Sequence, residues 1–318
     1  MSLLSIDRKA VTLTRARDLF AGIGWAVAAK SLRLQEHGWD WDEDVVRTRT
    51  VNGFITMGRD VREVYGAVGR YDLEIGSPPC ERFTSSGHGD GTQARDEIVR
   101  IVLAMKEPAD IYRAIIDLDR HHEKIGLVLE PFRVLLENPY ARAAVWEQVP
   151  PVLPIWQAIG KKLADWGWSV SVKTVNASWY GVPQDRRRSI LLARRDHAAR
   201  IPGEMDKRIM RDVFPDRHGW VQRSNYSAPS AYVGQTAQER GRTMRTMDQL
   251  SVTMTRKAAQ WVHPDGSITK MTVADMAAVQ TFPDGMKFTG GLISQRLQIG
   301  NAVPPTMAEA LIKAAIDT

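Results

Sequence analysis

The chain contains a single cysteine, Cys80, among its 318 residues. An intramolecular disulfide and a cysteine-rich zinc or iron–sulfur site are therefore excluded, and the seven histidines are scattered without metal-ligand spacing. No stretch approaches the roughly 18 consecutive apolar residues that a membrane-spanning helix needs, and the charged N-terminal segment lacks the apolar core of a signal peptide. Internal repeats and low-complexity tracts are also absent. We expect a soluble, cytoplasmic protein without a metal site.

The chain does have an excess of positive charge. Lysine and arginine number 43 against 37 aspartates and glutamates, which gives a formal net charge of +6, and arginines form runs at 186–188 and 194–195. This balance suits a polyanionic partner such as nucleic acid. On charge alone, a solvated basic surface is an equally good interpretation.

The apolar pattern predicts strands that alternate with helices. Strand-like runs occupy residues 71–76, 132–137, 168–175 and 189–193. Helical patterns occupy residues 96–105, 111–121, 154–166, 271–280 and 305–316. Such alternation predicts an α/β fold with a doubly wound, mostly parallel sheet covered on both faces. Because the pattern dissolves at 196–247, we predict a small lobe there and a main domain of residues 1–195 plus 248–318.

A glycine turn lies near the start of the chain. The apolar residues Val11 and Leu13 precede Gly22 and Gly24, and an alanine-rich stretch follows, so we predict strand, turn and helix. Glycines at such a turn let the backbone approach a ligand at the helix N-terminus. The full dinucleotide fingerprint is missing, so a purely structural turn is an equal alternative.

Three aspartates downstream of the turn, Asp40, Asp42 and Asp60, are placed where a carboxylate could accept hydrogen bonds from a ribose or an adenine amino group. The strand predicted before them, residues 35–39, is unusually polar. Each aspartate taken separately is more typical of a loop carboxylate, and the sequence does not choose between Asp40 and Asp42.

The neighbourhood of Cys80 is the strongest candidate for chemistry. Pro78 and Pro79 fix the backbone at the carboxyl end of a predicted strand, where open α/β sheets bind their ligands. The glycine-rich continuation suits a loop that closes over a substrate. A cysteine presented in this way attacks as the thiolate, which Arg82 favours and Glu81 opposes. The alternative is a rigid proline turn with an inert cysteine.

Two further clusters add polar side chains. Glu137 ends the predicted strand 132–137, and an apolar setting favours the protonated form that a general acid requires. A surface glutamate before a turn is the alternative. Gln184, Arg186 and Arg188 alternate along an extended segment, so both arginines could project into one cleft, where their fork of donors suits carbonyl oxygens and phosphates. A solvated basic strand is the alternative here.

Taken in order, these segments resemble the motifs of the cytosine-5 DNA methyltransferase family. The resemblance covers nearly the whole chain except the predicted lobe. It rests on the segments DLFAGIG (18–24), PPCERFTSSG (78–87), LENP (136–139), YGVPQDRRR (180–188), QTFPD (280–284) and IGNAVPP (299–305).

The resemblance implies an S-adenosylmethionine-dependent enzyme acting on double-stranded DNA. Cys80 would attack C6 of a cytosine rotated out of the duplex, Glu137 would protonate or hydrogen-bond N3, and Arg188 with Arg186 would hold the base. The cofactor residues that it implies are Phe20, Ala21, Gly22, Ile23, Gly24, Asp40, Trp41, Asp60, Val61, Pro79, Asn301 and Val303. The DNA-binding residues that it implies are Arg82, Thr84, Ser85, Gln184, Arg223, Arg240 and Arg242.

Several positions depart from the family pattern. Trp25 stands where glycine is more common, Glu81 where glutamine is common, and Pro139 where valine is usual. The small lobe predicts a short recognition sequence, because it can reach few base edges. The resemblance also implies a bacterial or phage restriction-modification setting and a monomer, and leaves open a cognate restriction endonuclease. Two alternatives stay open: a tRNA cytosine-5 methyltransferase, and a catalytically inactive DNA-binding relative.

Overall fold

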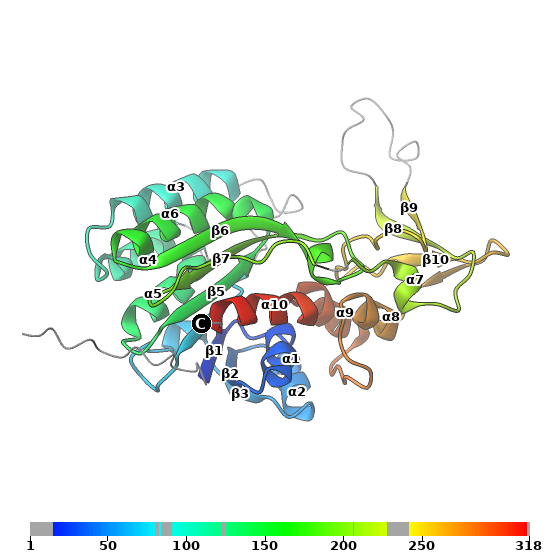
Figure 1. The fold of residues 1–318 in the computed structure, drawn as a ribbon, viewed down its shortest axis with the longest axis horizontal. Helices are drawn as coiled ribbons and strands as arrows, with labels where there is room; N and C mark the ends of the chain where they lie inside the picture. The colour runs from blue at the N-terminus through cyan, green and yellow to red at the C-terminus, as the bar shows by residue number, and fades with distance from the viewer. Residues whose placement is uncertain are drawn as a thin grey trace, which may run out of the picture.

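A seven-stranded sheet forms the centre of the molecule (Figure 1). The computed structural model describes residues 15–79, 83, 91–121, 125–205, 207–227 and 242–316. The strands pair in the order β3-β2-β1-β4-β5-β7-β6, and β7 alone runs antiparallel to its neighbours in this sheet. They are β1 Arg15–Leu19, β2 Gln35–Asp40, β3 Ile55–Gly58, β4 Leu73–Gly76, β5 Ala143–Gln148, β6 Ser169–Asn176 and β7 Arg187–Arg194. The prediction of a doubly wound, mostly parallel sheet is confirmed.

Helices cover both faces of this sheet. The alternation of side chains along β5 shows it, because Ala144 and Trp146 pack against α3–α6, whereas Ala143 and Val145 pack against α1 and α10. The α-helices are α1 Gly24–Ser31, α2 Glu43–Val51, α3 Gly91–Ala104, α4 Asp110–His121, α5 Glu130–Glu137, α6 Leu153–Asp165, α7 Met210–Val213, α8 Val273–Val279, α9 Leu292–Asn301 and α10 Pro305–Ile316. The 3-10 helices are η1 Val61–Glu63, η2 Gly126–Leu129, η3 Pro150–Val152 and η4 Ala177–Tyr180.

The register of the parallel strands brings their carboxyl ends together. Leu19 of β1 pairs with Trp39 on one side and with Gly76 on the other, and Gly76 pairs with Trp146 of β5. The loops after β1, β2, β4 and β5 therefore begin at one edge of the sheet. This edge is where an open α/β sheet binds its ligand.

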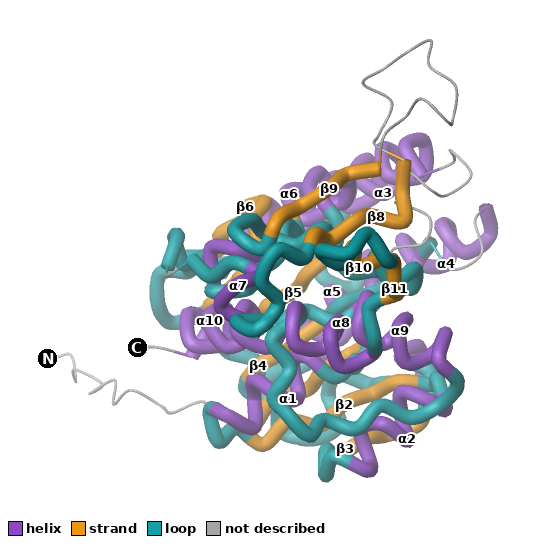
Figure 2. Tube along the Cα trace, turned by 90° about the vertical axis from the view of Figure 1, so that its right-hand side faces the viewer, coloured by secondary structure: helices purple, strands orange, loops and turns teal. Residues whose placement is uncertain are grey.

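A second, antiparallel sheet builds the smaller part of the molecule (Figure 2). Its order is β11-β10-β8-β9, with β8 Val221–Ser227, β9 Arg242–Thr246, β10 Gln260–Val262 and β11 Ile268–Lys270. Strands β10 and β11 follow residue 247, so the lobe boundary predicted there cuts through this sheet. Short strands separated by turns carry too little periodicity to be recognised from sequence.

One local prediction is wrong, and one strand was not predicted. Residues 132–137 form helix α5 and not a strand, because Arg133 pairs with Glu130 and with Glu137 at helical spacing and Pro131 occupies the first turn. Strand β5, whose six residues are all buried, was not predicted. The strands predicted at 71–76, 168–175 and 189–193 are confirmed as β4, β6 and β7. The predicted strand residues Val11 and Leu13 lie outside the described residues.

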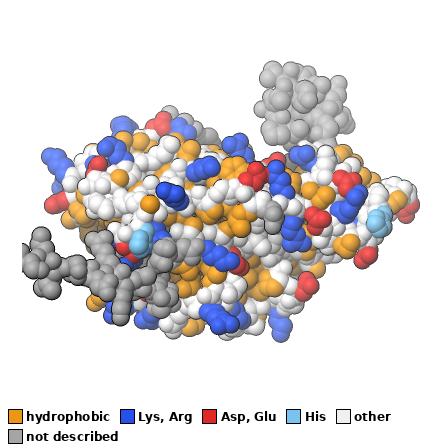
Figure 3. All heavy atoms as spheres, in the orientation of Figure 1, with side chains coloured by type: hydrophobic (Ala, Val, Ile, Leu, Met, Phe, Trp, Pro, Cys, Tyr) orange, Lys and Arg blue, Asp and Glu red, His pale blue; other side chains and the backbone are white. Residues whose placement is uncertain are grey.

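Charged side chains are spread over the molecule. On the face shown in Figure 3, lysines and arginines are interspersed with acidic side chains over both parts of the molecule and form no single basic patch. Within the described ranges, every helix is too short or too polar to cross a bilayer.

Candidate active site

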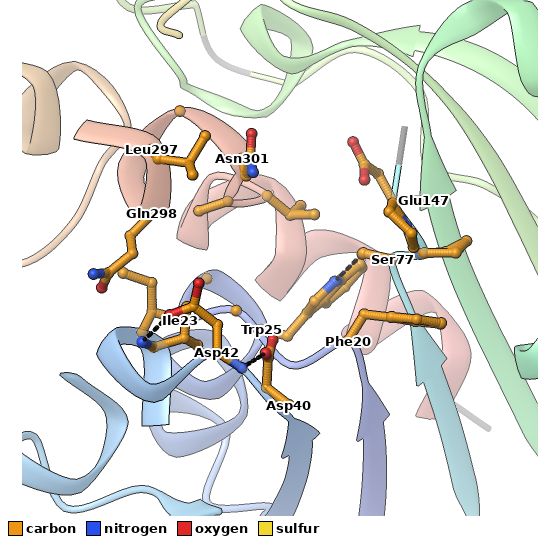
Figure 4. A pocket seen from close by; sticks show the side chains of 18 of the residues that line it. Phe20, Ile23, Trp25, Asp40, Asp42, Ser77, Glu147, Leu297, Gln298 and Asn301 are labelled. Atoms are coloured by element: carbon orange, nitrogen blue, oxygen red, sulfur yellow. Dashed lines mark hydrogen bonds between the residues drawn. The ribbon is translucent and has the colours of Figure 1, made fainter. Parts of the chain in front are cut away.

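A cavity of about 360 Å³ opens at the carboxyl ends of the parallel strands (Figure 4). Its lining comes from both ends of the chain: the turn after β1, the loops after β2, β4 and β5, and the segment from α9 to Val303. A volume of this size suits a ligand as large as a nucleoside with a side chain. Asn301 near the end of the chain and the first glycine turn therefore line the same cavity.

The glycine turn is shaped by close contact with the end of the chain. Phe20 adopts a φ of 57°, in the left-handed region, so the chain reverses sharply at the end of β1. A Cβ on Gly24 would lie 1.8 Å from the carbonyl oxygen of Val303, a distance that no side chain tolerates. Gly24 is thus required for the last motif to pack against the first.

Asp40 and Asp42 both line the cavity but have different roles. The Oδ1 of Asp42 caps helix α2, accepting from Asp44 N at 2.9 Å and from Val45 N at 3.1 Å. Asp40 ends β2, and burial raises its pKa to about 6. Beside it, the indole of Trp41 is 58% exposed and lines the same cavity. This arrangement favours Asp40 over Asp42 as the acceptor for a ligand.

Most of the other predicted cofactor residues line the cavity as well. Asp60 caps η1 and pairs with Arg62, whose hydrogen bonds hold the pKa of this carboxyl below its ordinary value. Ala21 is completely buried and is not among the lining residues. The predicted cofactor residues that do line the cavity are Phe20, Gly22, Ile23, Gly24, Asp40, Trp41, Asp60, Val61, Pro79, Asn301 and Val303.

The segment that leads to Cys80 is held from two sides. Trp25 donates its indole N–H to Ser77 Oγ at 2.9 Å, and Figure 4 shows the indole pointing toward Ser77 beside Phe20. From the end of β5, Gln148 donates to the carbonyl of Pro78 at 2.5 Å. The residues before Cys80 are therefore fixed between the glycine turn and the β5 end, whereas Cys80 itself lies outside the described residues.

Glu147 is the carboxylate that the cavity contains at the end of β5. Its side chain is only 6% exposed, and its Oε1 lies 2.6 Å from the Nε of Arg188. The ion pair with Arg188 holds this carboxylate at the cavity that Ser77, Pro78 and Pro79 also line, directly before the cysteine in the chain.

Glu137, the predicted general acid, is elsewhere. It ends helix α5, where Oε2 accepts from the backbone N–H of Gly66 and Oε1 from Tyr112 and Arg133. It is not among the residues that line the cavity. Its neighbour Asn138 donates a hydrogen bond to Glu74. Burial raises the pKa of Glu74 to about 7. These contacts bind the end of α5 to the loop before β4, to α4 and to β4 itself.

The arginine motif divides into two roles. Arg188 reaches Glu147, while Arg186 is 1% exposed and donates to the carbonyl oxygens of Gly300 and Ala302 at 2.9 and 3.0 Å. Arg186 therefore holds the motif IGNAVPP (299–305) at the wall of the cavity. Gln184, predicted to contact DNA, is completely buried, and its amide bonds Gln280 and the Met254 N–H.

The remaining predicted DNA-binding residues are placed only in part. Arg223 is partly buried in β8 and donates to the Oε1 of Gln260 on β10. Arg242 begins β9, and its side chain is not described. The residues that lie outside the described ranges are Arg82, Thr84, Ser85 and Arg240.

Sequence reasoning missed Glu147, although a signal for it exists. Residues 143–146 form an apolar run, Glu147 and Gln148 follow it, and Pro150 and Pro151 come after one further residue, Val149. The arrangement parallels Gly76, Ser77, Pro78 and Pro79 after β4, where a strand end is also followed by two prolines. A search for strand ends followed by paired prolines would have found the end of β4 before Cys80 and the end of β5 with Glu147.

Comparison with known proteins places these features in a family. The family model described as C-5 cytosine-specific DNA methylase matches residues 129–216 and 204–317. The type II methyltransferase M1.HphI of Haemophilus parahaemolyticus is 24% identical over 78% of this chain and 68% of its own length. The type II methyltransferase M.HgiDI of Herpetosiphon aurantiacus is 28% identical over 74% of this chain and 70% of its own.

Solved structures share the fold. The Entamoeba histolytica methyltransferase EhMeth superposes with a TM-score of 0.66 at 12% identity, covering 96% of this chain and 99% of its own. The S. pombe Dnmt2 methyltransferase superposes with a TM-score of 0.63 at 14% identity, covering 94% of this chain and 97% of its own. At these identities the likeness concerns the fold alone.

Proposed function

Because the chain belongs to the C-5 cytosine-specific DNA methylase family, we propose that it methylates C5 of a flipped-out cytosine in double-stranded DNA, with Cys80 as nucleophile and Glu147 as acid. Glu147 replaces Glu137, the residue that the sequence motif suggested. The observation that carries this proposal is the meeting of Glu147, Arg188 and the Ser77–Pro79 segment at one cavity.

The cavity residues fit S-adenosylmethionine as the cofactor. Asp40 supplies a carboxylate for ribose hydroxyls, and Trp41 an exposed aromatic face on which adenine can stack. The turn at Gly22 and the N-terminus of α1 suit the carboxylate of the methionine part, since helix N-termini attract anions. When bound, this cofactor supplies an electrophilic methyl group on a sulfonium.

The protein's own residues make C5 of cytosine nucleophilic. The Cys80 thiolate forms a bond to C6 while Glu147 gives a proton to N3, so the ring becomes an enamine with electron density at C5. After C5 has gained the methyl group, its proton leaves to a base, the returning electron pair expels the thiolate from C6, and N3 gives its proton back to Glu147. Arg188 keeps Glu147 in place throughout, because the ion pair joins the ends of β5 and β7.

A covalent trap tests the proposal. With S-adenosylmethionine present, 5-fluorocytosine DNA should form a denaturation-resistant adduct with the protein, and Cys80→Ser should form none. Failure of the wild-type protein to form the adduct would refute the mechanism. Parallel tritium transfer from labelled cofactor to duplex DNA and to tRNA separates the DNA reaction from the RNA alternative, since we expect label on DNA alone.

The biological setting that we propose is DNA modification of the kind named in the curated relatives, which are type II methyltransferases. The small antiparallel sheet offers few side chains to base edges, so we propose a short recognition sequence with affinity dominated by phosphate contacts. Bisulfite sequencing of DNA from cells that express the chain reads both the activity and the target.

A further inference from the structure

Strand β2 contains a buried ion pair that an internal strand does not need. Strands covered on both faces are normally apolar, yet Glu36 of β2 is 7% exposed, and its partner Arg49 on α2 is completely buried. Burying two charges costs free energy that their attraction scarcely repays. The pair therefore points to a role for the arginine beyond holding β2 and α2 together.

The contacts of Arg49 show what it reaches. Its Nη2 donates to both carboxylate oxygens of Glu36, at 2.7 and 2.9 Å, and its Nε donates to Thr56 Oγ1 at 2.8 Å. Its Nη1 donates to the carbonyl oxygen of Gly22 at 2.6 Å. Glu36 and Thr56 in the sheet thus hold Nη2 and Nε of the guanidinium, and Nη1 is bonded to the glycine turn.

Gly38 makes this reach possible. A Cβ at Gly38 would lie 2.3 Å from Nη2 of Arg49 and 2.6 Å from the Cβ of Ala21, so any side chain there would displace the guanidinium or the turn. Because Gly38 has no side chain, it leaves the space through which Arg49 approaches Gly22.

Fixing the Gly22 carbonyl also fixes the direction of the next N–H. In a trans peptide the carbonyl and the N–H point to opposite sides, so the N–H of Ile23 is directed away from Arg49. Gly22, Ile23 and Gly24 line the cavity, and Arg49 does not.

We infer that Arg49 is a positioning residue for cofactor binding: docked beneath Gly22 through the gap at Gly38, it holds the turn that meets the methionine carboxylate of S-adenosylmethionine. The inference rests on the proposed function for the identity of the ligand. It assigns a purpose to the polar sequence of β2, which the catalytic chemistry does not use.

The test compares variants of the full-length protein by calorimetric titration with S-adenosyl-L-homocysteine in the absence of DNA. The double variant Arg49→Met/Glu36→Gln removes both members of the pair, so that neither is left as a buried charge without the other. We expect its Kd to rise by at least about tenfold, the effect of losing one charge-assisted hydrogen bond. Arg49→Lys, which keeps the charge but loses the fork, should recover part of the affinity, and Gly38→Ala should lose affinity with Arg49 intact.

The matched control is Arg47→Met/Glu43→Gln, on the same helix. Arg47 is 57% exposed and pairs with Glu43 at the surface, so this change should leave the Kd within about twofold of wild type. Steady-state methylation adds a second readout: KM for the cofactor should rise in the Arg49 variants while KM for DNA stays constant. A general structural defect would move both.

Two failures are distinguishable. If the wild-type protein does not bind S-adenosyl-L-homocysteine, the cofactor assignment in the proposed function is wrong and the inference falls with it. If the wild type binds and the folded double variant binds within about twofold of it, the inference alone is overturned. Should the double variant fail to fold, Arg49→Lys and Gly38→Ala decide by the same criterion.

Discussion

Replacing Glu147 by glutamine should stop methyl transfer while leaving the fold in place. Glutamine matches glutamate in shape but cannot give up a proton to N3, and loss of a general acid typically costs about 10²–10⁴ in rate. That range corresponds to about 3–5 kcal/mol of transition-state stabilisation. Single-turnover methylation at saturating cofactor and DNA measures it directly, because product release does not contribute.

The same change has a separate cost in stability. Arg188 loses the carboxylate 2.6 Å from its Nε, but its side chain is 13% exposed and also donates to the Arg187 carbonyl. We therefore expect a loss of about 1–3 kcal/mol in the free energy of unfolding, which is below the range for a fully buried pair. Urea denaturation separates this loss from the effect on rate.

Glu137→Gln is the matched control, since Glu137 is the carboxylate that the sequence motif suggested. Its oxygens bind Arg133, Tyr112 and Gly66, so we expect about 1–2 kcal/mol of lost stability and a single-turnover rate within about threefold of wild type. The reasoning is refuted if Glu147→Gln keeps more than about one tenth of the wild-type rate, or if Glu137→Gln loses as much as Glu147→Gln.

Three further predictions follow from the cavity. Gly24→Ala forces a Cβ against the Val303 carbonyl, so we expect about 1–3 kcal/mol of lost stability by urea denaturation and weaker binding of S-adenosyl-L-homocysteine; an unchanged protein would contradict the required close approach. Because the pKa of Asp40 is raised to about 6, protonation below that pH should weaken this binding by about tenfold per pH unit, and Asp40→Asn should be weak and independent of pH in the same titration. Gln148→Leu removes the bond to the Pro78 carbonyl and should lower the single-turnover rate by about tenfold with the cofactor Kd unchanged; equal loss in both would indicate a general defect.

The central sheet could be predicted because its signals are local. Runs such as 71–76 and 189–193 are apolar, bounded by turn residues and alternate with helices, which is enough to recognise a doubly wound sheet. The edge where the loops converge follows from that topology alone. The cavity's position, and most of the residues of the glycine turn that line it, were therefore accessible from the sequence.

Glu137 was predicted on two grounds: the segment LENP resembles a motif of the family, and the short apolar run before it is ambiguous between strand and helix. Residues 132–137 read as a strand that delivers a carboxylate, but pairing of Arg133 with residues three before and four after it stabilises a helix. Strand β5 begins with two alanines, which are poor strand formers. The sequence therefore did not predict this strand, whose last two residues are Glu147 and Gln148. The prediction of Glu137, which does not line the cavity, thus rested on the motif together with two neighbouring secondary-structure errors.

Arg49 illustrates what sequence reasoning cannot reach. Nothing local distinguishes it from Arg47, which lies two residues earlier on the same helix and is exposed. The difference appears only when β2 pairs with β1, because Gly38 then lies beside the glycine turn and leaves a gap that one guanidinium fills. The one sequence feature that points to such a residue is the polar composition of β2, a strand inside a sheet covered on both faces. It indicates that some buried charge must be paired, and the structure shows that the arginine of this pair also reaches the carbonyl of Gly22 in the glycine turn.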